Sequence, residues 1–147
     1  MELSRGYSAP VFAPHVTMAG GIQGPAREVI SKMKRLAKQI TPFGVRLTQA
    51  DFLDEYYRCL FIRVAKTQPI MEANKLAREV FGLHDPCAFM PHLSLLYGNL
   101  PSSAKERIIT SLGRQFELEF KVSSLHLYLT KGAPMGWRRM GRVGLKL

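Results

Sequence analysis

The chain has 147 residues, of which 46% are hydrophobic and 22% charged, and this size and composition suit one folded domain and exclude a disordered or fibrous protein. No apolar run approaches the roughly 18 residues that a membrane-spanning helix needs, and the N-terminus resembles neither a secretory signal nor a transit peptide. The net charge of +10 predicts attraction to phosphates or polyanions, although a solvated basic surface explains it equally well.

The first half of the chain predicts one short strand, one helix and two further strands. The short strand is expected at residues 13–18. A helix is expected over residues 26–40, because Pro25 suits the start of a helix and apolar residues recur with the 3.6-residue period. These apolar residues are Ala26, Val29, Ile30, Met33, Leu36, Ala37 and Ile40. Residues 43–52 and 55–65 are rich in β-branched and aromatic side chains, and they predict a pair of strands.

The second half begins with another helix, which should start near Pro69 and end at Gly82. A loop is expected at residues 84–91, where "HDPCAFMP" lacks any apolar period. The following "HLSLLYG", residues 92–98, predicts a strand.

A third helix is expected from Ser103, because Ser103 and Glu106 are in capping-box register. Its buried stripe would consist of Ile108, Ile109, Leu112 and Phe116. Residues 116–122 alternate apolar and charged side chains, the clearest pattern of a half-buried strand, and residues 124–130 and 137–147 predict two more strands. The whole order suits an α+β fold of mainly antiparallel sheets with helices packed outside.

One short motif occurs twice: "PHVT" is followed seventy-seven positions later by "PHLS". Residues i and i+2 of a strand point to the same face, so His15 should project with Thr17 and His92 with Ser94. A histidine in a single motif of this kind is more often structural. Two motifs in the same register are not readily supplied by chance, so the pair favours a functional site.

Two histidines opposed across a cleft can act as general base and general acid, because an unperturbed imidazole titrates at about 6.5. Hydroxyl groups between them can donate hydrogen bonds to anionic oxygens. This combination suits the hydrolysis of a phosphodiester, in which one histidine removes a proton from water and the other protonates the departing oxygen. Neither a metal ion nor another cofactor is required.

Residues 11–147 resemble the two-histidine phosphoesterase superfamily, and in particular its cyclic nucleotide phosphodiesterase branch of plant and yeast type. The likeness rests on "PHVT", on "MPHLSLLYG" with Tyr97, on the preceding "YYRCLFIRV" and on the closing strand with its tryptophan. The resemblance implies a bilobed, pseudo-twofold fold with a central cleft and one motif strand from each lobe.

The resemblance also implies an activity. Such enzymes open nucleoside 2′,3′-cyclic phosphates or ADP-ribose 1″,2″-cyclic phosphate to the 2′- or 1″-phosphate, in RNA metabolism such as tRNA splicing. The expected partners are therefore a small cyclic nucleotide or an RNA 3′-end. His15 and His92 would be the catalytic residues, with a preference for His92 as the base, while Thr17 and Ser94 would bind the phosphate.

Members of this family carry a further strand and helix before the first motif, whereas only 14 residues precede His15 here. We therefore expect a single bilobed domain over residues 1–147 that lacks this strand and helix and leaves a sheet edge unpaired. The alternative function is a nucleotide- or RNA-binding module that retains the two-histidine cleft without turnover.

The remaining residues allow two interpretations each. Simple alternation places Tyr97 on the face opposite His92, where it would pack; a bend at the following glycine would instead turn it toward substrate. Trp137 either packs the last strand or stacks on a nucleobase. Cys59 and Cys87 lack the spacing of a disulfide framework or a zinc site, which indicates a reducing compartment. We expect a cytoplasmic monomer without membrane contact.

Overall fold

The computed structural model describes residues 2–84 and 87–147. The helices are α1 (Glu2–Gly6), α2 (Ala26–Ala37), α3 (Gln68–Phe81), α4 (Ser102–Leu112) and the 3-10 helix η1 (Pro134–Gly136). The strands are β1 (Phe43–Asp51), β2 (Leu60–Val64), β3 (His92–Leu96), β4 (Gln115–Val122), β5 (Ser124–Leu129) and β6 (Arg138–Gly144). Three of the helices and all six strands lie where the sequence predicts them.

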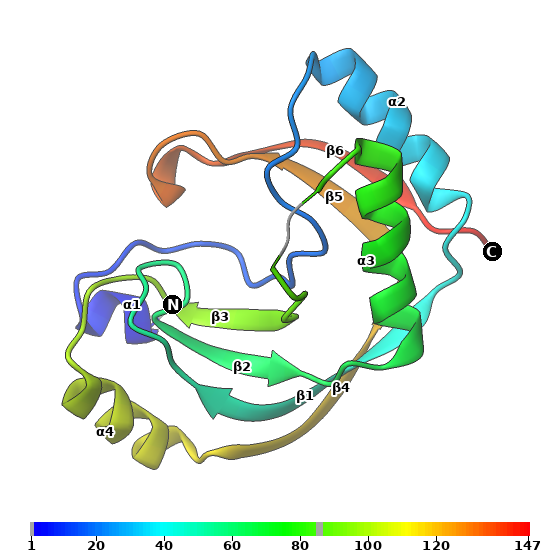
Figure 1. The fold of residues 1–147 in the computed structure, drawn as a ribbon. Helices are drawn as coiled ribbons and strands as arrows, with labels where there is room; N and C mark the ends of the chain where they lie inside the picture. The colour runs from blue at the N-terminus through cyan, green and yellow to red at the C-terminus, as the bar shows by residue number, and fades with distance from the viewer. Residues whose placement is uncertain (1, 85–86) are drawn as a thin grey trace.

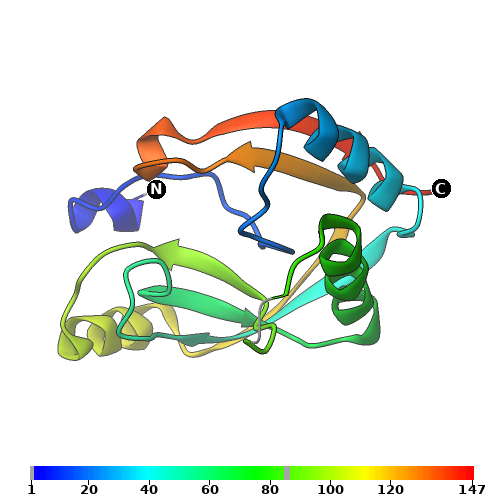
Figure 2. The same ribbon diagram turned by 45° about the horizontal axis from the view of Figure 1, so that its top comes forward.

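The strands form two antiparallel sheets, as the α+β prediction requires (Figure 1). One sheet has four strands in the order β3-β2-β1-β4, so β3 and β4 are its edges, and the other is the β5–β6 hairpin. Figure 2 shows the two sheets as separate layers, with the segment that follows α1 running between them. This segment carries the first motif.

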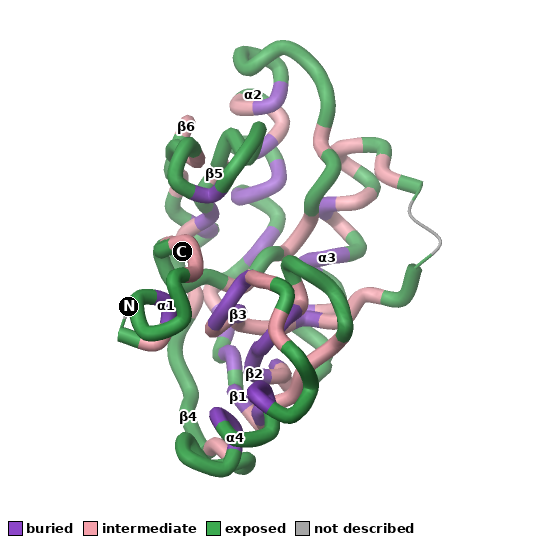
Figure 3. The backbone as a smooth tube through the Cα atoms, turned by 90° about the vertical axis from the view of Figure 1, so that its left-hand side faces the viewer, coloured by how far each residue is buried: buried purple, intermediate pink, exposed green. Residues whose placement is uncertain are grey.

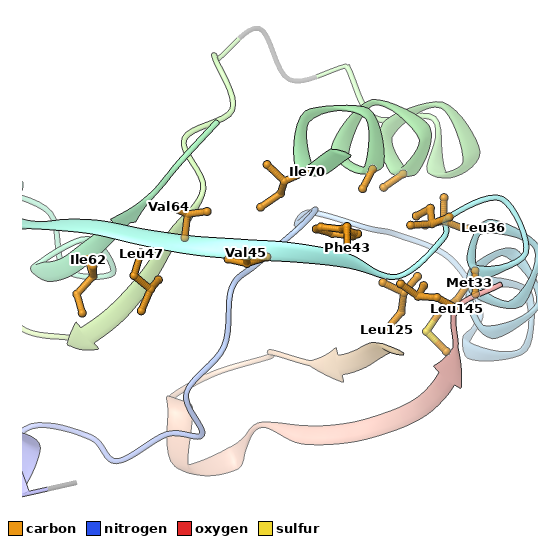
Figure 4. Close-up of a cluster of buried hydrophobic side chains, with 14 residues drawn as sticks. Met33, Leu36, Phe43, Val45, Leu47, Ile62, Val64, Ile70, Leu125 and Leu145 are labelled. Atoms are coloured by element: carbon orange, nitrogen blue, oxygen red, sulfur yellow. The ribbon is translucent and has the colours of Figure 1, made fainter. Parts of the chain in front are cut away.

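Helices α2 and α3 lie at the end of the molecule where the two sheets meet. The amphipathic helix α2 packs against β5, β6 and α3, while α3 also contacts β1. The main core lies among these elements, and Figure 4 shows some of its side chains, including Met33, Val45, Ile70, Leu125 and Leu145. Each aliphatic side chain of this size contributes about 1.5–3 kcal/mol when it is fully buried. A second core cluster lies under α4 and includes Leu60, Leu96 and Ile109.

The ends of α3 follow the predicted signals. Pro69 lies in the first turn, where a missing N–H costs nothing. Gly82 adopts the left-handed conformation (φ 64°) and its N–H donates to the carbonyls of Arg78 and Glu79, which closes the helix. This geometry confirms the predicted boundary.

The prediction for α4 is wrong in two respects. The residue before the helix is Pro101 and no side chain caps it, so the predicted capping box of Ser103 and Glu106 does not form. Leu112 is 49% exposed, and Phe116 belongs to β4 instead of the helix. The buried residues of the helix are Ala104, Lys105, Ile108 and Ile109.

The prediction that β4 is half-buried is also wrong. Leu118 is 55% and Phe120 is 40% exposed, and Figure 3 shows the strand as largely exposed. The apolar alternation predicted which face these side chains share, but β4 is the outermost strand and little covers it.

The first motif does not form the predicted strand. Its only described sheet contact is an isolated antiparallel bridge between Val16 and Leu93 of β3. The predicted loop at residues 84–91 includes Asp85 and Pro86, which lie outside the described residues. Within residues 2–84 and 87–147, no helix has the length and apolarity needed to cross a membrane.

Candidate active site

The two motifs lie side by side because Val16 pairs antiparallel with Leu93. This bridge uses the edge of β3 that does not pair with β2. Regular antiparallel pairing about this bridge would set His15 opposite Ser94 and Thr17 opposite His92. The charge of His15 acts on His92, so the two imidazoles lie near each other.

Both imidazoles are held by the same local hydrogen bond. Nδ1 of His15 lies 2.6 Å from the carbonyl oxygen of Ala13, and Nδ1 of His92 lies 2.9 Å from that of Met90. A carbonyl oxygen only accepts, so each Nδ1 carries the proton and donates. Each Nε2 is then the atom left to accept or deliver a proton. The repeated motif thus produces a repeated ring orientation.

The two histidines differ in burial. His15 is exposed, whereas His92 is partly buried on β3. Burial lowers the pKa of His92 below 6.5. The hydrogen bond to the Met90 carbonyl acts in the opposite direction and raises this pKa, but by less. The positive charges of Arg58, His15 and Arg63 lower this pKa further. His92 is therefore neutral at neutral pH, with Nε2 free to accept a proton.

Strand β2 supports the face on which His92 and Ser94 lie. In the β2–β3 register, Phe61 pairs with Ser94 and Arg63 pairs with His92. The fully buried Phe61 ring lies 5.2 Å from the His92 ring, which restricts its movement. The Arg63 guanidinium is 2.6 Å from the Asp51 carboxylate and remains 36% exposed beside the histidine. This places a cation next to the two motifs.

An aromatic cluster borders the motifs on the other side and consists of Phe12, Tyr57, Tyr97 and Trp137. The Phe12 and Tyr97 rings are stacked with centroids 3.9 Å apart, and Phe12 also lies edge-on to His15 at 6.0 Å. Tyr57 contacts Tyr97 edge-on at 5.3 Å and Trp137 at 6.1 Å with an interplanar angle of 27°. Tyr57 is 50% exposed, so the cluster keeps one accessible aromatic ring.

Tyr97 connects this cluster to the second motif. It follows the last residue of β3, and its side chain hydrogen-bonds to that of Ser94. Burial raises the pKa of Tyr97, and this hydrogen bond opposes the effect. The phenol therefore stays protonated at neutral pH. Its ring lies on the side of Ser94 because the strand ends before Tyr97, at Leu96.

The sequence and fold of this chain are similar to those of known proteins. The sequence model of the 2′-5′ RNA ligase superfamily matches residues 2–134. The chain belongs to this superfamily. It is similar to a protein of Arabidopsis thaliana named cyclic phosphodiesterase, with 26% identity over 128 residues that cover 84% of this chain and 71% of the relative. The predicted likeness to two-histidine phosphoesterases is thereby confirmed, and a phosphoesterase activity is supported.

Two solved structures share the superfamily fold with this chain. TT0787 of Thermus thermophilus superposes with a TM-score of 0.64 at 18% identity, over 90% of this chain and 78% of the other. LigT of E. coli, solved in complex with NADP+, superposes with a TM-score of 0.63 at 18% identity, over 96% and 83%. At this identity the likeness concerns the fold.

Of the five residues singled out in the sequence, His15 lies near His92 and Ser94 hydrogen-bonds to Tyr97, while Thr17 lies next to the Val16–Leu93 bridge. Sequence reasoning did not identify Phe12, Tyr57, Phe61 or Arg63 as their neighbours. Period-two alternation in "LFIRV" gave a signal for the last two, because residues 61 and 63 share a face. No local signal indicated Phe12 or Tyr57.

The described structure has a cavity beside Tyr97 and another along α3. One of about 230 Å³ reaches Tyr97 and is also lined by Tyr7, Tyr56 and Asn99. A larger one of about 640 Å³ lies along α3, where His84 lines it. Within the described ranges, no three side chains of His, Cys, Asp or Glu gather in a way that would hold a metal ion.

Proposed function

We propose that this protein hydrolyses cyclic phosphodiesters without a metal ion, by a two-histidine acid–base mechanism. The substrates are nucleoside 2′,3′-cyclic phosphates, ADP-ribose 1″,2″-cyclic phosphate or both, and the products are the 2′- and 1″-phosphates. The observation that carries this proposal is the Val16–Leu93 pairing, which brings the two motifs side by side. Superfamily membership and the similarity to a cyclic phosphodiesterase support the same reaction class.

The reaction needs one proton acceptor and one proton donor. Nε2 of His92 accepts a proton from water as the water oxygen attacks phosphorus. In a nucleoside 2′,3′-cyclic phosphate the bond between phosphorus and the 3′-oxygen breaks, and in ADP-ribose cyclic phosphate the bond between phosphorus and the 2″-oxygen breaks. Nε2–H of His15 protonates the departing oxygen. The lowered pKa of His92 supports its role as base, because the ring is neutral before water attacks.

The other groups act on the phosphate and the base. Thr17 and Ser94 donate hydrogen bonds to the non-bridging oxygens, where negative charge accumulates in the transition state. The hydrogen bond between Tyr97 and Ser94 orients both side chains and uses one of their two hydroxyl protons, which leaves one donor for the phosphate. The exposed ring of Tyr57, with Trp137 behind it, offers a surface on which a nucleobase stacks.

A second candidate function has one observation in its favour. The first motif is joined to β3 by a single bridge, and both His15 and Thr17 are exposed. A loosely held acid would lower turnover while leaving binding intact. The alternative is therefore a nucleotide- or RNA-binding module that keeps the same four side chains.

A turnover assay on a panel of 2′,3′-cyclic nucleotides and ADP-ribose cyclic phosphate separates the two functions. We expect hydrolysis by the wild-type chain and a loss of about 10²–10⁴-fold in kcat for His15→Ala and for His92→Ala. His126→Ala is the control, because His126 is exposed on β5, hydrogen-bonds to Ser124 and belongs to neither motif. Binding of these ligands without turnover would favour the module, and near-normal turnover of a histidine variant would remove that residue from the mechanism.

A further inference from the structure

Strand β4 presents an open edge that has the properties of a pairing surface. It is eight residues long, contains no proline, and pairs with β1 on one side while forming the margin of the sheet on the other. Natural sheets protect such edges with short strands, prolines, bulges or unmatched charges. The sequence of β4 does contain charged residues, but their order decides whether they oppose or favour pairing with a second strand.

The apolar face of β4 lies next to a buried apolar face of β1 but is itself exposed to solvent. Leu118 pairs with Leu47 of β1, and Phe120 pairs with Val45, so each pair shares a face. Leu47 is 6% and Val45 is 2% exposed, against 55% for Leu118 and 40% for Phe120. The apolar residues of this face are therefore buried on β1 and exposed on the neighbouring strand β4.

The opposite face of β4 carries Glu117, Glu119 and Lys121. Neither Glu119 nor Lys121 has an ion-pair partner among the residues that the structure describes. Glu119 extends over Gly44, where the absent Cβ leaves room for its carboxylate. Both charged groups are exposed. On β1, Arg46 lies opposite Glu119 and Gly44 lies opposite Lys121.

We propose that β4 pairs antiparallel with β4 of a second copy of this chain, with the twofold axis at Phe120. In this register Glu119 faces Lys121 of the other copy, twice by symmetry, and Leu118 faces Val122. The two Phe120 rings meet on the axis. This inference is independent of the proposed function and departs from the monomer expected from the sequence.

Other in-phase registers fit less well. An axis at Glu119 sets Glu117 against Lys121 twice but also sets two Glu119 carboxylates against each other, and an axis at Leu118 sets Glu117 against Glu119 twice. Like charges directly opposite are destabilising, whereas opposite charges and aromatic pairs stabilise. The axis at Phe120 gives two opposite-charge pairs and no like-charge pair. It joins residues 118–122 of both copies, and the chain then departs into β5.

The joined area is small, so we expect a dimer that forms reversibly with rising protein concentration. Sedimentation velocity of the wild-type chain over a wide concentration range should show a monomer–dimer equilibrium. Glu119→Lys sets lysine against Lys121, and Lys121→Glu sets glutamate against Glu119, so each variant alone should dimerise at least about tenfold more weakly. Glu117→Lys is the control, since it faces Ser123 in this register, carries the same charge change as Glu119→Lys and should dimerise like wild type.

The decisive arm mixes the two weakened variants. Glu119→Lys and Lys121→Glu together restore both opposite-charge pairs, so the mixture should form a heterodimer about as strongly as wild type forms its homodimer. The double variant Glu119→Lys/Lys121→Glu should recover homodimerisation for the same reason. The proposal is overturned by a wild-type chain that stays monomeric throughout, by single variants that dimerise normally, or by a mixture that stays monomeric.

Discussion

A side-chain hydrogen bond from α3 holds the residue that follows the first motif, and its removal tests how His15 is positioned. Nδ2 of Asn74 donates to the carbonyl oxygen of Met18 at 2.8 Å, and Asn74 is only 7% exposed. Asn74→Ala leaves that partly buried carbonyl without a partner. We expect the free energy of unfolding to fall by about 1–2 kcal/mol, since an unsatisfied buried group costs about 1–3 kcal/mol.

The matched control is Lys75→Ala, at the next and exposed position of the same helix, whose effect should stay within about 0.5 kcal/mol. Urea unfolding measures both variants. Because misplacement of a catalytic group by about 1 Å can cost 10²-fold in rate, kcat/KM of Asn74→Ala should fall well below that of the control at a temperature where both are folded. Equal stability of the two variants would refute the structural role of the bond, and equal kcat/KM would refute its role in positioning His15.

Four further predictions concern the proposed chemistry. Excess EDTA should leave turnover unchanged, because the proposed site has imidazoles and hydroxyls but no cluster of carboxylates or thiolates; loss of turnover that one added metal restores would reject the metal-free mechanism. Thr17→Ala and Ser94→Ala should lose less kcat than either histidine variant, with part of the effect in KM, and steady-state kinetics would contradict this if a hydroxyl variant were the most damaged. The pH profile of kcat/KM should be bell-shaped with its acidic limb below 6.5, where the pKa of His92 lies, whereas a flat profile from about pH 5 to 9 would exclude an acid–base cycle. The same lowered pKa means that the unfolded chain binds more protons, so the free energy of unfolding should decrease as pH falls from 6.5 through the folded-state pKa of His92; urea unfolding of His92→Gln should show a flatter dependence, and an unchanged slope would contradict this.

Local patterns were sufficient to predict most elements of the fold. The buried stripe of α2 follows the 3.6-residue period, and the ends of α3 follow a proline and a glycine whose backbone requirements are local. The prediction that His92 and Ser94 share a face needed only the period of a strand. Each of these features depends on residues a few positions apart.

Features that depend on contacts between distant residues could not be predicted from local sequence patterns. The alternation in β4 showed that Leu118 and Phe120 share a face, but not that this face would lie beyond the cover of the core. The capping pattern at Ser103 failed because α4 begins one residue earlier, directly after Pro101. The aromatic cluster combines residues 12, 57, 97 and 137, whose proximity no local pattern contains.

The site also shows how two nearly identical motifs come to differ. Both histidines donate from Nδ1 to the carbonyl two residues before them, so the motif alone gives them the same orientation. His92 lies on β3, which pairs with β2, and its ring contacts the buried Phe61 ring, while His15 is exposed in a segment with one bridge. The lowered pKa of His92 arises first from this burial and then from nearby positive charges, and not from the motif sequence. A division into base and acid is therefore a property of the surroundings of each motif. Replacing Phe61 with a smaller side chain should admit water beneath His92 and raise its pKa toward 6.5, which an NMR titration of the ring would detect; an unchanged pKa would mean that the burial comes from elsewhere.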